Sequence, residues 1–322
     1  MAEPSPEPRF TRGRLVVGVV LVAVVVAAGV VAATRLLGSD EAMLAYIRAG
    51  ELVLDTLDGD SRTFALPSDL PSPALSPDGR MLAYGDERVT MLDLRDGNEI
   101  EGPEGRVVGW TPDGHVVVER PGVEDRTFLA RWDLESEPVP IVVLGLGSHV
   151  GEPVWLGPEV FAIALPPRAG GDPTTYVTSV SAGTVVAVHT FPNAVPLAAA
   201  PGGTELLYGV PGGEVVATHP DGSNARDVGL AGDFTSAAVS QGGLVAISGR
   251  TTDDVAGTWV LAAGGDEPVR VSADPATAMV WLDESTIAIV TDAGVLVTLS
   301  LPEVAETPIA TDVLPGFLAV LR

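Results

Sequence analysis

A unit of roughly 40 residues recurs along most of this chain of 322 residues, and it constrains the fold more than any other feature. Its most complete copy is Leu75–Gly97, LSPDGRMLAYGDERVTMLDLRDG. An apolar strand end runs into a Ser-Pro-Asp-Gly turn, and two further strands follow, the last closed by Asp96-Gly97. This order of strands and turns predicts a β-meander.

Later copies have lost much of this motif but keep its spacing. If Leu75 is the anchor before the turn, the equivalent positions are Trp110, Trp155, Ala199, Val239 and Trp281. Successive anchors lie 35, 45, 44, 40 and 42 residues apart. Periods of this length with about four strands each are typical of β-propeller blades. The sequence therefore predicts an all-β propeller over residues 43–322.

The two ends of the repeat region complement each other. Residues 43–66 offer three strands without an innermost one, and residues 316–322 form a single apolar strand. An unpaired terminal strand would be an aggregation-prone edge. We therefore expect the C-terminal strand to pair with Met43–Ile47 and close the ring. Six full blades plus one split blade make seven, and counts of six or eight stay open because the later copies are eroded.

The turn at Ser76–Gly79, the apolar strand after it and the closing Asp93–Gly97 resemble the TolB-like β-propeller repeat, which is WD-repeat-like. The resemblance covers residues 43–322 as architecture, and its motif is sharp at Leu75–Gly97 and partly at Trp110–Gly114. It implies a non-catalytic binding or scaffold module in the bacterial cell envelope, with a protein or peptide as its partner.

The N-terminal region differs from the repeats in composition. Residues 1–14 are polar and Pro-rich, which predicts a disordered tail. Leu15–Ala33 contains no charged side chain and is long enough to cross a bilayer core of about 30 Å. We expect a transmembrane helix over residues 15–35, in the lipid bilayer through residues 15–33, and a short linker over 36–42. The rival is a signal peptide cleaved after Val31-Ala32-Ala33.

Charged residues beside this apolar run predict its orientation. Arg9, Arg12 and Arg14 precede the run, whereas Arg35 alone follows it directly. Because positive charge is retained on the cytoplasmic side, we expect a single-pass protein of the cell membrane. Its N-terminus would be cytoplasmic and its C-terminal domain extracytoplasmic.

Composition excludes several classes of function. Cysteine is absent, so disulfides and thiolate metal sites are excluded. The net charge of −25 is unsuited to binding nucleic acid, which needs a cationic face. The histidines lie in different repeats without metal-ligand spacing, and no serine nucleophile motif occurs. We therefore expect no cofactor and no catalytic residue, while calcium binding by paired carboxylates stays open.

Binding residues are expected in the loops that precede each innermost strand, because these loops line one face of a propeller and the mouth of its channel. The candidates are Asp69, His149, Glu152, Phe191, Asn193, Asp233, Phe234 and Asp274. Two alternatives stay open. One is a propeller-type enzyme, a glycosidase, lyase or lactonase, that uses acidic residues at the channel mouth. The other is a structural accessory subunit of a membrane complex.

Overall fold

The computed structural model describes most of the repeat region. The described residues are 43–56, 61–67, 70–122, 126–145, 150–166, 173–181, 184–262 and 267–321. The expected tail, transmembrane helix and linker at 1–14, 15–35 and 36–42 lie outside them. In the described ranges, no helix is long and apolar enough to cross a membrane.

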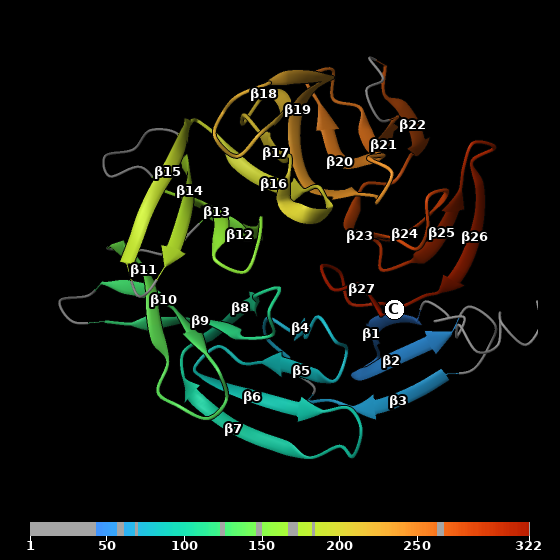
Figure 1. Cartoon of the computed structure of the whole chain (residues 1–322). Coiled ribbons are helices and arrows are strands. Elements are labelled where there is room, and N and C mark those ends of the chain that lie inside the picture. Colours follow the sequence, from blue (N-terminus) through green and yellow to red (C-terminus); the bar gives the residue numbers. More distant parts are fainter. Residues whose placement is uncertain are drawn as a thin grey trace, which may run out of the picture. The chain divides into compact units, whose positions relative to one another are not determined.

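The described residues form an all-β propeller in which antiparallel meanders follow one another around a common centre (Figure 1). Each meander runs from an innermost to an outermost strand. The first contains β27 (Ala319–Leu321), β1 (Met43–Arg48), β2 (Glu51–Thr56) and β3 (Ser61–Ala65). The second contains β4 (Ala74–Leu75), β5 (Met81–Tyr84), β6 (Arg88–Asp93) and β7 (Glu99–Glu104). The third contains β8 (Arg106–Trp110), β9 (Val116–Pro121), β10 (Thr127–Trp132) and β11 (Val139–Gly145).

Two further four-stranded sheets have the same order. One contains β12 (Val150–Trp155), β13 (Val160–Leu165), β14 (Thr174–Ser181) and β15 (Thr184–Pro192). The other contains β23 (Ala276–Trp281), β24 (Thr286–Thr291), β25 (Leu296–Ser300) and β26 (Ala305–Ala310).

The remaining sheet has seven strands, and a short 3-10 helix at Pro201–Gly203 follows its first strand. Its strands are β16 (Val195–Ala199), β17 (Leu206–Gly209), β18 (Gly213–Thr218), β19 (Arg226–Val239), β20 (Val245–Thr251), β21 (Ala256–Leu261) and β22 (Val269–Ser272). The first part of β19 pairs with β18 and its last part pairs with β20, so one strand serves two meanders.

Seven hydrophobic clusters, each between two neighbouring meanders, hold the described part of the chain together. Because the second strand of most meanders is covered on both faces, its sequence is an apolar run rather than an alternation, as in VFAIAL of β13 and TIAIVT of β24. The outermost strands are covered less and are more polar, as in EIEGPE of β7.

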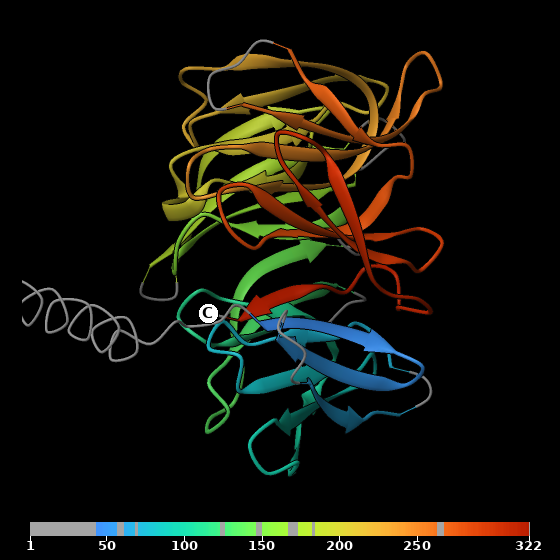
Figure 2. The same cartoon turned by 90° about the vertical axis from the view of Figure 1, so that its right-hand side faces the viewer.

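The ring closes where the ends of the described region meet. β27 pairs antiparallel with β1, and Figure 2 shows the red C-terminal strand beside the blue first strand. Phe317 and Leu321 are buried in the cluster between the first two meanders, with exposed fractions of 6% and 9%. The paired strand is shorter than the expected 316–322, because Gly316 adopts a positive φ of 85° and turns the chain just before it.

Two tryptophans at the anchor positions link neighbouring innermost strands. Nε1 of Trp110 donates to the Ala74 carbonyl oxygen at 2.9 Å, and Nε1 of Trp281 donates to the Ala238 carbonyl oxygen at 3.1 Å. Both rings are buried. Each therefore adds a directional contact to the apolar packing between meanders.

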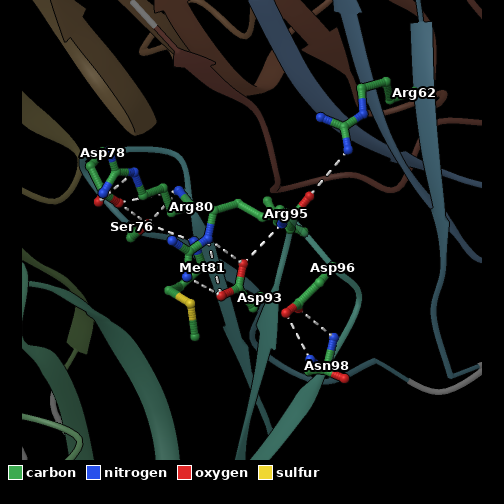
Figure 3. A network of polar contacts seen from close by, with 10 residues as sticks. Arg62, Ser76, Asp78, Arg80, Met81, Asp93, Arg95, Asp96 and Asn98 are labelled. Atoms are coloured by element: carbon green, nitrogen blue, oxygen red, sulfur yellow. Dashed lines mark hydrogen bonds and ion pairs between the residues drawn. The ribbon is translucent and has the colours of Figure 1, made fainter.

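The Leu75–Gly97 motif serves the turns of its own meander (Figure 3). The Ser76 hydroxyl accepts hydrogen bonds from the backbone N–H groups of Arg80 and Met81, at 3.1 and 2.9 Å, and donates to Asp78 at 2.7 Å. The Asp93 carboxylate accepts from the backbone N–H of Arg95 and from its guanidinium. These bonds satisfy polar groups that the turn would otherwise leave unpaired.

Removal of the closing strand tests how far the ring depends on it. We expect the full chain lacking residues 317–322 to lose most of its stability, because β1 loses one of its two partner strands and an apolar cluster opens. Phe317→Ala alone should lower the free energy of unfolding by about 3–5 kcal/mol. Urea denaturation measures both effects. Leu314→Ala, at a side chain that is 39% exposed, is the control and should change stability little. Unchanged unfolding of the truncated chain would contradict this role.

Stability at acid pH should depend on Asp93. Hydrogen bonds from Arg95 lower the pKa of this carboxyl from its usual range to about 2. A lowered pKa in the folded state means that the stabilisation is present above the ordinary pKa of Asp and is lost as the pH falls towards 2. The urea midpoint of the native chain should therefore fall more steeply between about pH 4 and 2 than that of Asp93→Asn or Arg95→Gln. Parallel curves would refute this assignment.

Candidate functional site

The ring of the described residues has two ends with different connections. The proximal end carries the turns between the first and second strands of each meander, such as 76–80, and the first described residue, Met43, lies there beside Leu321. The distal end carries the connections into each innermost strand, such as 311–318, and those between second and third strands, such as 85–87.

Three adjoining cavities lie at the distal end. The central cavity, about 350 Å³, lies between the connections 70–73 and 314–317 and the start of β8. The acidic cavity, about 630 Å³, lies between the second and third meanders. The third cavity, about 470 Å³, lies between the first and last meanders. Arg106 lines the first two, and Leu70, Leu314 and Pro315 line the first and third, so the three cavities adjoin one another and together make up the distal depression.

Apolar side chains form part of the lining at the centre of this depression, beside polar groups. Leu70, Val107 and Leu314 line the central cavity, and Phe317 forms part of its wall while its ring is anchored in the core. Leu314 is one of the few large apolar side chains of the described residues with substantial exposure, at 39%. Its backbone N–H donates to the Ile47 carbonyl oxygen at 2.7 Å, which fixes the connection to β1. The apolar surface is therefore held in place rather than adaptable.

Carboxylates line the two cavities that flank this centre. Those lining the flanking cavities are Asp86, Glu87, Glu104, Glu119, Asp292 and Asp312. The cations among the same linings are Arg106 and Arg120. The depression thus carries more acidic than basic groups, which favours a positively charged ligand.

One ion pair crosses the wall between the central and acidic cavities. Nε of Arg106, on β8, lies 3.2 Å from Oε2 of Glu119, on the neighbouring β9. The Glu119 side chain is 8% exposed and that of Arg106 is 41% exposed. A buried carboxylate is costly unless it is paired, so Arg106 serves the fold while its other edge reaches the cavity.

The binding residues predicted from the sequence do not all lie in the distal connections. Asp69 and His149 lie outside the described residues, and the Glu152 side chain is likewise not described although its backbone belongs to β12. Asn193 and Asp274 lie in exposed connections of the distal end, as expected. Asp233 and Phe234 lie within β19 rather than in a loop, because the strand continues unbroken from one meander into the next.

Phe191 was also expected in a loop, and that placement was wrong. It lies in β15 with its ring 6% exposed, in contact with the rings of His189 and Tyr208. Phe234 is partly buried against Trp259, with ring centroids 5.9 Å apart. Both aromatic rings therefore pack between meanders. None of the described candidates lines the three cavities, and a binding role for Asn193, Asp233 and Asp274 stays a prediction.

Sequence analysis missed the residues that do line the depression. Leu70 and Leu314 lie in connections between an outermost strand and the next innermost one, which is where binding residues were expected, but the repeat is too eroded there to single them out. Arg106 and Arg120 lie on strands, where the sequence pattern gives no functional signal. Within the described residues, no three His, Asp or Glu side chains are grouped so that they could hold a metal ion.

Comparisons with known proteins agree on architecture. TolB from Acinetobacter baumannii is 13% identical, with 88% of this chain and 67% of that chain covered and a TM-score of 0.51. An oligogalacturonate lyase in complex with manganese is 16% identical over 79% of this chain and 83% of that one, with a TM-score of 0.61. The fold is a β-propeller, as it is in these two proteins.

A chain of the mitotic checkpoint complex has a similar likeness, with 15% identity, 76% and 77% coverage and a TM-score of 0.55. No protein-family model and no curated protein matches the sequence. These solved propellers differ widely in function, so the likeness shows the fold of this propeller alone.

Proposed function

We propose that this protein is a non-catalytic binding module whose distal depression takes an extended, positively charged peptide segment of a partner protein. The observation that carries the proposal is the adjacency of the three cavities, which places the apolar side chains of Leu70 and Leu314 between carboxylates of the flanking cavities on one end of the ring. Volumes of 350–630 Å³ are in the usual range for pockets that enclose a few side chains.

The chemistry of the lining favours a peptide over a compact ligand. An apolar side chain would enter between Leu70 and Leu314, and flanking Lys or Arg residues would lie beside Asp86 and Glu87 on one side or Asp292 on the other. The apolar contact would supply affinity through buried area, and the charges would supply steering and orientation.

We also infer a ring of seven blades. The seven-stranded sheet counts as two blades because β19 is the outermost strand of one and the innermost strand of the next. With the five separate four-stranded sheets, this count matches the seven clusters between neighbouring meanders in the described residues.

We further propose that residues 15–35 anchor the propeller in the cell membrane with its bulk outside the cytoplasm, at the cell envelope. This rests on the uncharged run Leu15–Ala33 and on the arginines that precede it.

Peptide selection tests the binding proposal. A random heptapeptide library displayed on phage, screened against the full chain in detergent, should yield peptides that combine a large apolar residue with Lys or Arg. Leu314→Glu should weaken a selected peptide at least about tenfold, because it places a charge in the apolar centre. Affinity should also fall as salt is raised.

Val255→Glu is the matched control for this experiment. Val255 also lies at the distal end and is 39% exposed, as Leu314 is, but it does not line the three cavities. It should leave affinity unchanged. The proposal fails if no peptide is enriched over the starting library, or if the two variants weaken binding equally.

Membrane fractionation tests the anchor. In a bacterial host, the full chain should remain in the membrane fraction after carbonate washing, and protease added outside the inner membrane should cleave the propeller. Val25→Arg should release the protein, because a cation at the centre of a membrane helix costs about 2.5–3.5 kcal/mol. A soluble native chain, or a mature N-terminus at Thr34 as a cleaved signal peptide would leave, would refute the anchor.

A further inference from the structure

Arg120 is a cation without a partner in the acidic cavity. Its Nε is buried and makes no hydrogen bond, and no ion pair or hydrogen bond joins the rest of its side chain to any described residue. Most other described arginines bond to a carboxylate or a carbonyl oxygen, as Arg106 does with Glu119. A buried donor left unpaired is rare in folded proteins and calls for an explanation.

The fold holds Arg120 in this position. It lies near the end of β9, directly opposite Phe128 of β10, so its backbone is fixed on a central strand of the sheet. Gly105, the single residue between β7 and β8, leaves room for its aliphatic stem. A Cβ at Gly105 would lie 3.0 Å from Cγ of Arg120 and 2.5 Å from the Glu119 carbonyl oxygen, and φ there is +133°.

Carboxylates in the same cavity are engaged elsewhere or lie apart from Arg120. The Asp86 carboxylate accepts a hydrogen bond from the Ser72 hydroxyl at 3.4 Å, and the Glu104 carboxylate lies 3.5 Å from the Arg88 guanidinium. The Arg120 guanidinium and the carboxylates of Asp86 and Glu104 therefore line the same cavity without pairing with each other.

We propose that the acidic cavity binds a carboxylate of the ligand at Arg120 and an adjacent cationic group of the same ligand at Asp86, Glu87 and Glu104. A guanidinium binds carboxylate with directional, charge-assisted hydrogen bonds, and such a ligand would give the Arg120 guanidinium a partner of opposite charge. The chemical class is a peptide in which a carboxylate neighbours Arg or Lys, and a C-terminal Arg or Lys residue is the simplest example.

A ligand with one kind of charge fits this cavity less well. An anion alone would meet Arg120 but would be repelled by the surrounding carboxylates, and a cation alone would leave Arg120 without a partner. A ligand that carries an anion beside a cation would pair with Arg120 through the anion and with the carboxylates through the cation. This inference rests on the proposed peptide-binding function and adds to it the identity of the charged end.

Matched peptides test this assignment on the full chain. The probes are a fluorescent peptide with the sequence Gly-Leu-Pro-Gly-Gly-Arg with a free C-terminal carboxylate, the same peptide with a C-terminal amide, and an amidated peptide ending in Gly-Asp-Arg-Gly. Fluorescence anisotropy should show at least tenfold tighter binding of the free acid than of the amide. Tight binding of the Asp-Arg peptide would also support the site and would identify a side chain as a second source of carboxylate.

Arg120→Gln should abolish the difference between acid and amide, and Arg120→Lys should keep part of it because the charge is retained without the planar donor geometry. Arg250→Gln is the control, since Arg250 lies on another part of the distal end and pairs with Asp254. Melting curves of all variants should match that of the native chain, and the Lys variant keeps the test valid if the Gln variant unfolds.

The outcomes separate this inference from the function on which it rests. Equal binding of acid and amide by the native chain, with Leu314→Glu still harmful, would overturn the role of Arg120 and leave the binding module intact. Absence of binding by every peptide, including those selected from the library, would overturn both.

Discussion

Each sheet of this propeller buries both faces, and the rest of the structure depends on that constraint. Seven apolar clusters of the described residues join neighbouring meanders, and the cluster between the first two includes Phe317 and Leu321 from the far end of the chain. A sheet at an open end would expose one of these faces to water. Closure by β27 and β1 therefore completes the core as well as the hydrogen bonding.

The two ends of the closed ring differ in what their polar groups and connections do. At the proximal end, Ser76, Asp78 and Asp93 bond to backbone and side-chain groups of their own turns, so their polarity is used within the meander. At the distal end, the connections differ from one meander to the next. Variation at the exposed positions of these connections leaves the apolar clusters intact, which is why loops on a rigid scaffold can acquire binding surfaces.

Much of the fold could be predicted from the sequence, because turn residues and apolar runs repeat with a regular spacing. The role of Leu75–Gly97 and the β1–β27 pairing follow from local pattern and from the cost of an exposed edge. The boundary at Phe234 was missed because Gly232, with φ at +149°, lets β19 turn between two meanders without a loop. Arg120 was missed because the lack of a hydrogen-bond partner depends on which groups surround its side chain in three dimensions, and sequence spacing does not give that.

The distal depression arises from unequal connections between similar units. The chain enters β8 through Gly105 alone, whereas it enters β4 and β27 through the longer segments 66–73 and 311–318. The longer connections bring Leu70 and Leu314 to the centre, and the short one leaves the ends of β8 and β9 uncovered, with Arg106 and Arg120 in the wall. A ring of identical blades would have no such asymmetry. Under the proposed function, specificity would reside where the connections depart from the repeat, which is also where comparison of folds is least informative.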